Sequence, residues 1–250
     1  MRQPLLTPGN CAVLLGEETD TLDPTGDVIK TAEVPALTVE DVHAALAPMR
    51  GSVMQQPPAF SALKVKGERA YDLARRGEAV ELEPRPVELR SAEVLEVDGG
   101  RLRLRLRTGA GYYVRSLARD LATALGTVGR LEALRRTESG KFRIEEAVSV
   151  EELRAAHRGE GQAPPLIPVA DALRTLPELT LSRQEYREIA GRGSVPRSLM
   201  GRQLPELAGG EELTNGDEEL EVKLLAPNGA LAAIGGARNG RIERVVTFFR

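Results

Sequence analysis

One stretch of the chain constrains the fold more than any other. Residues 101–126 read RLRLRLRTGAGYYVRSLARDLATALG. The strict Arg/Leu alternation over 101–107 predicts a strand with leucines on a buried face and arginines on the opposite face. Apolar residues of 114–125 then recur at helical spacing, and Gly126 marks the end of that helix. The sequence therefore predicts a strand, a glycine-rich corner and an amphipathic helix in direct succession.

The arginine face of this strand has a spacing that suits phosphate binding. Arg101, Arg103, Arg105 and Arg107 follow one another at every second position, so their side chains lie about 7 Å apart along a strand. This spacing is close to that of phosphates along a nucleic-acid backbone. The alternative is an exposed sheet face whose arginines pair with acids on neighbouring strands, such as Glu93.

The charge of the chain is distributed unevenly. Segment 85–143 holds 13 basic and 7 acidic residues, although the whole chain has a net charge of −3. Nearly all of these bases are arginines, which suit two-pronged contact with phosphate or carboxylate groups. A basic segment inside an acidic chain favours nucleic-acid binding, and a solvated charged face is the alternative interpretation.

The corner after the strand combines an arginine with a tyrosine. Arg115 falls in the first helical turn, where the helix is already partly positive, at a cost of about 0.3–1 kcal/mol. We therefore expect an anion, either a carboxylate or a phosphate, near its guanidinium. Tyr113 precedes the protein helix and could stack on a nucleic-acid base that has left its own base stack. The alternative is that Tyr113 is an ordinary aromatic residue of the core.

Composition excludes several other classes of protein. Apolar residues make up 41% of the 250 residues, enough for a proper core, and no apolar run is long enough for a membrane span or a signal peptide. One cysteine cannot form an internal disulfide, and with only two histidines beside it a His/Cys metal site is not expected. The cytosol is the compartment that this cysteine usage favours.

Turn and capping signals predict further elements along the chain. The C-terminal part should contain a helix that begins at a capping box of Ser182 and Glu185 and stops at Gly191, with short strands after it. In the N-terminal part we expect strands near 12–15 and 27–31, a helix after Thr38, a helix over 69–76, and a strand pair that turns at Gly99-Gly100.

Three long motifs resemble those of bacterial tRNA pseudouridine synthases of the TruB type. GYYVRSLARDLATALGTVGRLEALRRTESGKF resembles the family pattern GTYIRxLxxDLGxxLGxxAHLxxLRRTxxGxF. PPAFSALKVKGERAYDLARRGEAVELEPRPV resembles PPxYSAxKxxGxRAYExARxGxxxExxxRxV, and LGEETDTLDPTGDVIKTA resembles LGxxTDTxDxxGxV. Together the matches cover roughly residues 12 to 175, and motifs of this length are highly specific.

The resemblance implies both a fold and an activity. The fold is mixed α/β of the α+β type, with a largely antiparallel sheet flanked by helices, over residues 1–175; a small PUA-like β domain with RNA-binding function follows over 178–250. The activity is isomerisation of uridine 55, in the T-loop of tRNA, to pseudouridine after the base is flipped out. The resemblance implies no cofactor and no metal, the T-arm of tRNA as partner, and a monomer.

The family motifs also assign roles to residues of this chain. The resemblance implies that Tyr113 packs on the flipped base, that Leu134 lines the uracil pocket, and that Arg115 pairs with the catalytic aspartate. It likens segment 60–67 and the helix after it to a mobile element that closes on the tRNA arm. By this resemblance Lys64, Lys66 and Arg69 of that element contact RNA. Arg103 and Arg105 are expected to contact RNA because of the arginine face alone, which the family motif does not require.

One family motif is absent from this sequence. The nucleophile of the family is the Asp of GHxGxLDPxAxGxL, and the 250 residues contain no such motif. Leu22-Asp23-Pro24 is a similar triplet, but it falls in the second motif, TDTxDxxG, and the catalytic motif is expected further upstream. We therefore expect Asp20 and Asp23 to lie in a loop that does not face Arg115.

Two functions remain open at this point. The first is a tRNA pseudouridine-55 synthase whose full chain is longer than this sequence, so that these 250 residues alone are inactive. The second is a catalytically silent relative that binds tRNA or helps it to fold.

Overall fold

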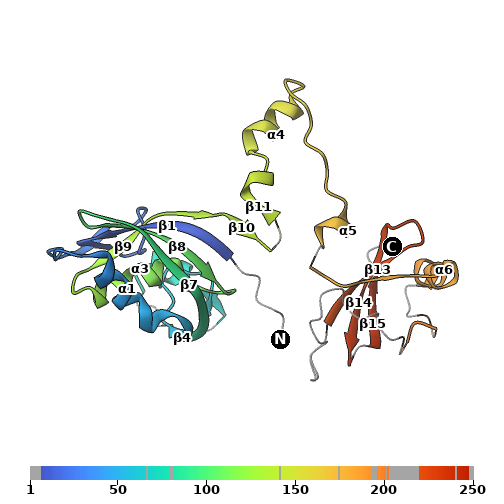
Figure 1. The fold of residues 1–250 in the computed structure, drawn as a ribbon, viewed down its shortest axis with the longest axis horizontal. Helices are drawn as coiled ribbons and strands as arrows, with labels where there is room; N and C mark the ends of the chain where they lie inside the picture. The colour runs from blue at the N-terminus through green and yellow to red at the C-terminus, as the bar shows by residue number, and fades with distance from the viewer. Residues whose placement is uncertain are drawn as a thin grey trace. The chain divides into compact units, whose positions relative to one another are not determined.

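The computed structural model describes residues 7–65, 67–78, 82–140, 142–173, 175–192, 196, 198–200, 202, 220–239 and 241–247. The chain divides into two compact units, and the boundary between them follows Ala147 (Figure 1). Among the described residues no helix is long and apolar enough to cross a membrane. The predicted domain boundary between residues 175 and 178 stays a prediction, and Lys66 lies outside the described residues.

An antiparallel sheet of five strands forms the centre of the first unit. The strands β7 (Arg85–Asp98) and β8 (Arg101–Thr108) form the predicted pair, and both Gly99 and Gly100 have positive φ values, 51° and 90°, in the two-residue turn between them. Such values are what a tight hairpin turn requires. In their order across the sheet the strands are β4 (Gly51–Gln55), β7 (Arg85–Asp98), β8 (Arg101–Thr108), β1 (Thr7–Leu15) and β9 (Gly129–Arg136).

The alternation in β8 places its two residue types as predicted. Leu102, Leu104 and Leu106 are at most 2% exposed, whereas every arginine of this strand is exposed. The helices α1 (Val39–Leu46) and α3 (Val114–Ala124) cover the leucine face and share its core (Figure 1). Full burial of a leucine side chain contributes about 1.5–3 kcal/mol, so this face fixes α3 on the sheet.

Both helices start where the sequence predicts. Thr38 caps α1 in a reciprocal capping box with Asp41, which satisfies backbone N–H groups that the helix leaves unpaired. Tyr113 occupies the N-cap position of α3, but its side chain makes no capping hydrogen bond. The start of α3 is therefore held by residues from other segments.

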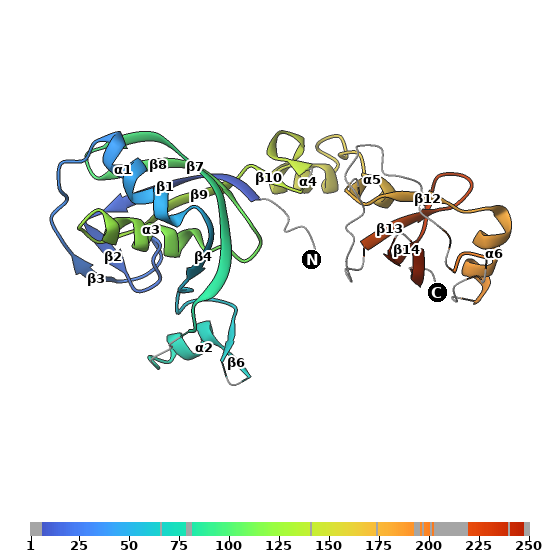
Figure 2. The same cartoon turned by 60° about the horizontal axis from the view of Figure 1, so that its bottom comes forward.

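Two excursions leave the ends of strands of this sheet, one after β1 and one after β4. The first is a hairpin of β2 (Glu17–Thr19) and β3 (Val28–Thr31) with a loop over 20–27. The second lies between β4 and β7 and contains β5 (Lys64–Val65), β6 (Glu68–Arg69) and α2 (Ala70–Arg75), which matches the helix predicted over 69–76. Figure 2 shows β6 and α2 beyond the end of β4, on the side away from α1.

Short elements complete the first unit and lead into the second. They are η1 (Ala47–Met49), β10 (Glu138–Ser139), β11 (Phe142–Arg143), η2 (Ile144–Glu146), α4 (Val150–His157) and α5 (Val169–Ala172).

The second unit contains a separate four-stranded sheet with its own core. The predicted capping box is confirmed, because Ser182 and Glu185 exchange hydrogen bonds at the start of α6, which ends one residue past Gly191. The mixed α/β fold with antiparallel sheets and a C-terminal β domain is likewise confirmed. Its elements are β12 (Glu178–Thr180), α6 (Arg183–Arg192), β13 (Leu220–Leu225), β14 (Leu231–Arg238) and β15 (Arg241–Thr247).

Candidate active site

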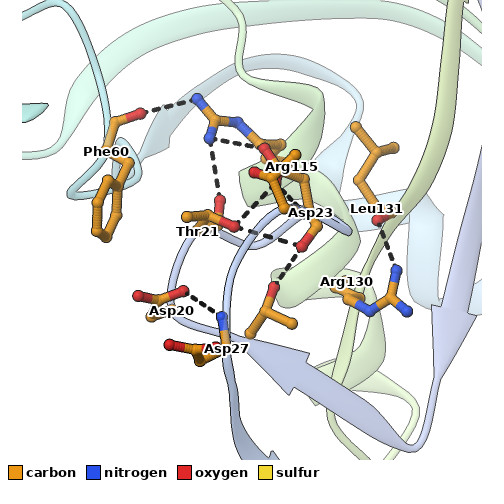
Figure 3. A network of polar contacts seen from close by, with 10 residues as sticks. Asp20, Thr21, Asp23, Asp27, Phe60, Arg115, Arg130 and Leu131 are labelled. Carbon is orange, nitrogen blue, oxygen red and sulfur yellow. Dashed lines mark hydrogen bonds and ion pairs between the residues drawn. The ribbon is translucent and has the colours of Figure 1, made fainter.

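The guanidinium of Arg115 joins three segments of the first unit. Its Nη1 donates to the carbonyl oxygen of Thr21 at 3.0 Å and to Oδ2 of Asp23 at 3.1 Å. Its Nη2 donates to the carbonyl oxygen of Phe60 at 2.8 Å. Figure 3 shows these contacts converging on Arg115 from the 20–27 loop and from the segment that follows β4. The anion expected beside Arg115 is therefore a carboxylate of the chain itself.

The expectation that Asp23 does not face Arg115 is wrong. Leu22 adopts a left-handed φ of 60° and is buried, and its carbonyl oxygen accepts a hydrogen bond from the Leu131 N–H of β9 at 3.0 Å. This bend turns the next residue, Asp23, back toward α3. A motif match fixes the position of a residue in the sequence, but it does not fix the direction in which its loop folds.

The other two acids of the loop, Asp20 and Asp27, join its two ends. Oδ1 of Asp20 accepts a hydrogen bond from the Asp27 N–H at 3.0 Å, and the Asp20 N–H donates to the Asp27 carbonyl oxygen at 3.1 Å. Gly26 packs so closely that an added Cβ would lie 2.1 Å from Asp20 Oδ1. Only glycine fits there without moving the loop, so the glycine of the TDTxDxxG motif has a steric reason.

The Asp23 carboxylate is fully engaged. Oδ1 accepts hydrogen bonds from the Thr21 hydroxyl at 2.8 Å and from both the N–H and the hydroxyl of Thr25, while Oδ2 binds Arg115. Burial alone raises the pKa of Asp23, but the hydrogen bonds from Thr25 and Thr21 and the charge of Arg115 outweigh it, so the pKa is lowered. Asp23 is therefore ionised at neutral pH.

Arg115 retains donors beyond these contacts. A guanidinium has five N–H groups, and within the described part of the chain Arg115 uses three of them. Its side chain is 25% exposed, so solvent or a ligand can reach it. The residue can therefore bind a second anion while it keeps Asp23.

A cavity of about 390 Å³ opens beside Arg115. Two of its lining residues stack, because the Arg75 guanidinium lies 4.5 Å from the centre of the Tyr71 ring and also donates to the Tyr71 hydroxyl at 2.8 Å. Its volume lies in the range of small-ligand pockets. Apart from their place in the segment RAYDLAR, which matches a family pattern, no sequence signal predicted that Tyr71 and Arg75 line this cavity. The cavity is lined by Asp20, Thr21, Thr25, Gly26, Asp27, Phe60, Tyr71, Arg75 and Arg115.

Tyr113 and Leu134 do not line this cavity. Tyr113 is half-buried at the start of α3, next to Val114. Leu134 is 53% exposed on β9 and pairs across the sheet with Cys11, which itself pairs with Leu104 of the buried face. Leu134 thus lies on the helix-covered side of the sheet, and its predicted role in a uracil pocket stays a prediction.

The predicted RNA-binding residues fall on two separate surfaces. Lys64 and Arg69 are exposed and face each other across the β5–β6 hairpin. Arg103 and Arg105 lie on the sheet face opposite α3, where they pair with Glu96 at 2.8 Å and with Glu93 at 2.7 Å. The pairing with Glu93 that the sequence left open is confirmed, and phosphate binding by these two arginines stays a prediction.

Family models match this chain over most of its length. The model described as "TruB family pseudouridylate synthase (N terminal domain)" matches residues 10–114, and "tRNA pseudouridylate synthase B C-terminal domain" matches residues 115–174. The chain belongs to the TruB family of pseudouridylate synthases. The two matches meet inside α3, between Val114 and Arg115, so both contribute residues to the site around Arg115.

Curated relatives of this TruB-family chain are named tRNA pseudouridine synthase B. The protein of Cereibacter sphaeroides is 46% identical over 168 residues, which are 67% of this chain and 56% of that protein. The protein of Novosphingobium aromaticivorans is 42% identical over 183 residues, which are 71% of this chain and 60% of that protein. The match to this chain thus spans little more than half the length of either relative.

Solved structures support the fold of this TruB-family chain. The structure titled "Crystal Structure of a Cbf5-Nop10-Gar1 Complex" matches with a TM-score of 0.63 at 16% identity, over 99% of this chain and 67% of that one. The structure titled "Structure of H/ACA RNP bound to a substrate RNA containing 2'-deoxyuridine" gives the same TM-score at 15% identity. At such identities the similarity concerns the fold alone.

Replacing Asp23 with Asn should destabilise the protein at neutral pH but not in acid. The folded-state pKa of Asp23 is lowered, so its stabilising contribution is present above the ordinary value of 3.8 and disappears as the pH falls through the folded-state pKa. We expect a loss on the order of 1–2 kcal/mol at neutral pH, because hydrogen bonds to a charged group are lost from a partly exposed site. Urea denaturation followed by circular dichroism at several pH values measures this loss.

The matched control is Asp98→Asn, which changes an exposed acid at the end of β7. A stability difference between wild type and Asp23→Asn that does not shrink in acid would show that the ionised carboxylate is not what Arg115 requires.

Proposed function

We propose that this chain is the part of a tRNA pseudouridine synthase that binds the T-arm and presents uridine 55 for isomerisation. The observation that carries the proposal is the state of Arg115, which is anchored by Thr21, Asp23 and Phe60 and keeps two N–H groups for a further anion. The names of the relatives give the substrate class, because they act on tRNA. A chain that acts on tRNA is expected in the cytoplasm and, by family resemblance, as a monomer.

The proposed reaction is an isomerisation of one nucleotide. The glycosidic bond from C1′ of the ribose to N1 of uracil breaks, the base turns, and C1′ bonds to C5 of the same base. C5 then loses its proton and N1 gains one, so the composition of the nucleotide is unchanged. No atom is added to the nucleotide by a co-reactant, so the proposal requires neither a cofactor nor a metal. Tyr113 and Leu134 would hold the flipped base, and Arg115 would keep a catalytic carboxylate ionised and in position.

Asp23 is not the nucleophile in this proposal. Both of its oxygens are occupied, one by Thr21 and Thr25 and the other by Arg115. A carboxylate that attacks carbon needs an oxygen free to approach the reacting atom. We propose that the nucleophile is instead the Asp of the family motif GHxGxLDP, which does not occur among these 250 residues, and that Arg115 binds it with its remaining N–H groups.

The second candidate function is a tRNA-binding module without chemistry. The observation that favours it is again the occupied Asp23 carboxylate, since no other carboxylate contacts Arg115 within the described residues. Such a module would use the same basic surfaces to hold the T-arm.

Binding to the T-arm should weaken steeply with salt. Contacts between arginines and phosphates release counterions, so the logarithm of the affinity should fall against the logarithm of salt concentration with a slope of roughly −0.7 to −0.9 per phosphate contacted. Exchanging Arg103 and Arg105 together for Glu should weaken binding to any tRNA, whereas Tyr113→Ala should mainly weaken discrimination for the T-loop uridine. Filter binding or fluorescence anisotropy over a salt series measures these effects.

The control for charge reversal is Arg154→Glu on α4, because Arg154 is 67% exposed and belongs to neither predicted RNA-binding surface. Binding that stays constant from low to moderate salt would contradict the proposal. Equal effects of the Arg103/Arg105 and Tyr113 changes on all RNAs would contradict the separate roles.

The 250-residue chain alone should not convert uridine 55. The purified chain is incubated with unmodified tRNA, and pseudouridine at position 55 is assayed; we expect no turnover, because the nucleophilic carboxylate is not part of this sequence. A longer chain in which a segment carrying GHxGxLDP precedes these 250 residues should convert uridine 55.

Two other results separate the candidates. Turnover by the chain alone that disappears in Asp23→Asn would make Asp23 the nucleophile and overturn its assignment as an anchor for Arg115. If the extended chain still binds the T-arm but does not turn over, the binding module is the better description.

A further inference from the structure

The side chain of Gln55 holds the backbone of Tyr113 from both sides. Oε1 of Gln55 accepts a hydrogen bond from the Tyr113 N–H at 2.9 Å, and Nε2 of Gln55 donates to the Tyr113 carbonyl oxygen at 3.1 Å. Gln55 is the last residue of β4 and is only 4% exposed. A buried amide that lost these partners would cost free energy, so this arrangement is strongly specified.

Tyr113 needs such support because its local sequence gives little. Gly111, two residues before it, has a left-handed φ of 78°, and the glycine-rich corner gains little rigidity from its own side chains. Tyr113 itself has φ −101° and ψ 106°, outside the helix that begins at Val114. The two Gln55 hydrogen bonds hold the N–H and the C=O on either side of its Cα, and thereby the direction of the Cα–Cβ bond from which the ring extends; the same C=O also accepts the Leu117 N–H of α3.

Neighbouring contacts make this junction rigid. The carbonyl oxygen of Gln56 accepts hydrogen bonds from the Ser116 hydroxyl at 2.7 Å and from Arg119 at 3.1 Å. With the Arg115 contact to Phe60, residues 55–60 are attached to the N-cap Tyr113 and to three residues of α3, namely Arg115, Ser116 and Arg119. Among these contacts, those of Gln55 reach Tyr113 through a side chain of β4, which can be replaced without changing the sequence of α3; the same side chain also hydrogen-bonds to Tyr112.

We propose that Gln55 is a positioning residue, which sets the orientation of Tyr113 toward the flipped base. This inference rests on the proposed function, because it assumes that Tyr113 contacts the target uridine. It extends that function by assigning the positioning of Tyr113 to a residue in a different element, at the point where the chain leaves the sheet for the hairpin that carries Lys64 and Arg69.

The test compares two neighbouring glutamines in RNA binding. Gln55→Glu keeps an acceptor for the Tyr113 N–H but loses the donor to its carbonyl oxygen. The matched control is Gln56→Glu, since the Gln56 side chain donates to the Leu82 carbonyl oxygen and not to α3. The Kd is measured for a T-arm hairpin with the target uridine and for the same hairpin with an abasic site. The ratio of the Kd for the abasic hairpin to the Kd for the uridine hairpin reports recognition of the base.

We expect Gln55→Glu to reduce this ratio about fivefold, the effect of one ordinary hydrogen bond, and Gln56→Glu to leave it unchanged. In a Tyr113→Ala background Gln55→Glu should have no further effect on the ratio. If the buried carboxylate of the first variant prevents folding, Gln55→Met, which has a similar size and no charge, removes both hydrogen bonds to Tyr113 and should reduce the ratio at least as much.

Four results would overturn the inference. Equal weakening of both hairpins by Gln55→Glu, or a loss that adds to that of Tyr113→Ala, would show a role in stability alone. If the wild-type protein discriminates between the two hairpins and Gln55→Glu leaves the ratio unchanged, Gln55 has no role in recognition of the base and the proposed function stays intact. A wild-type chain that binds the T-arm no better than an unrelated hairpin would overturn the proposed function and this inference together.

Discussion

The contact on which the rest of this site depends is the ion pair between Arg115 and Asp23. A guanidinium in the first turn of a helix is unfavourable, and here the loop over 20–27 supplies the compensating charge. The same guanidinium binds a carbonyl oxygen of that loop and the carbonyl oxygen of Phe60. One side chain therefore joins α3, the β2–β3 loop and the segment after β4, and the cavity of about 390 Å³ lies among these three.

The two faces of the central sheet serve different purposes. The leucine face is covered by helices, and it fixes α3 and therefore Arg115 against the sheet. On the other face Arg103 and Arg105 pair with Glu96 and Glu93. Exposed pairs of this kind contribute little to stability, about 0–1 kcal/mol, so they leave the arginines available to exchange a glutamate for a phosphate at small cost. Lys64 and Arg69 form a separate basic surface on the hairpin between β5 and β6.

Periodicity and family motifs predicted the fold better than they predicted the site. The Arg/Leu alternation predicted both faces of β8, and the capping residue Thr38 predicted the start of α1, because these are local properties of the chain. The position of Asp23 against Arg115 was mispredicted, since it depends on a left-handed Leu22 and on its hydrogen bond to Leu131, more than a hundred residues away. The clamp of Gln55 on Tyr113 and the stacked pair of Tyr71 and Arg75 likewise depend on tertiary contacts that no periodic pattern contains.

Hydrogen exchange in a variant of Arg115 tests most directly whether this residue joins the site together. In Arg115→Met, exchange should accelerate in both loops at once, at the amide of Thr25, which donates to Asp23, and at the amide of Ser61, just after Phe60. The amides of β8 should keep their wild-type protection, because the sheet does not depend on this contact. Acceleration in only one loop, or unchanged protection in both, would contradict the account of Arg115 as the residue that holds the site.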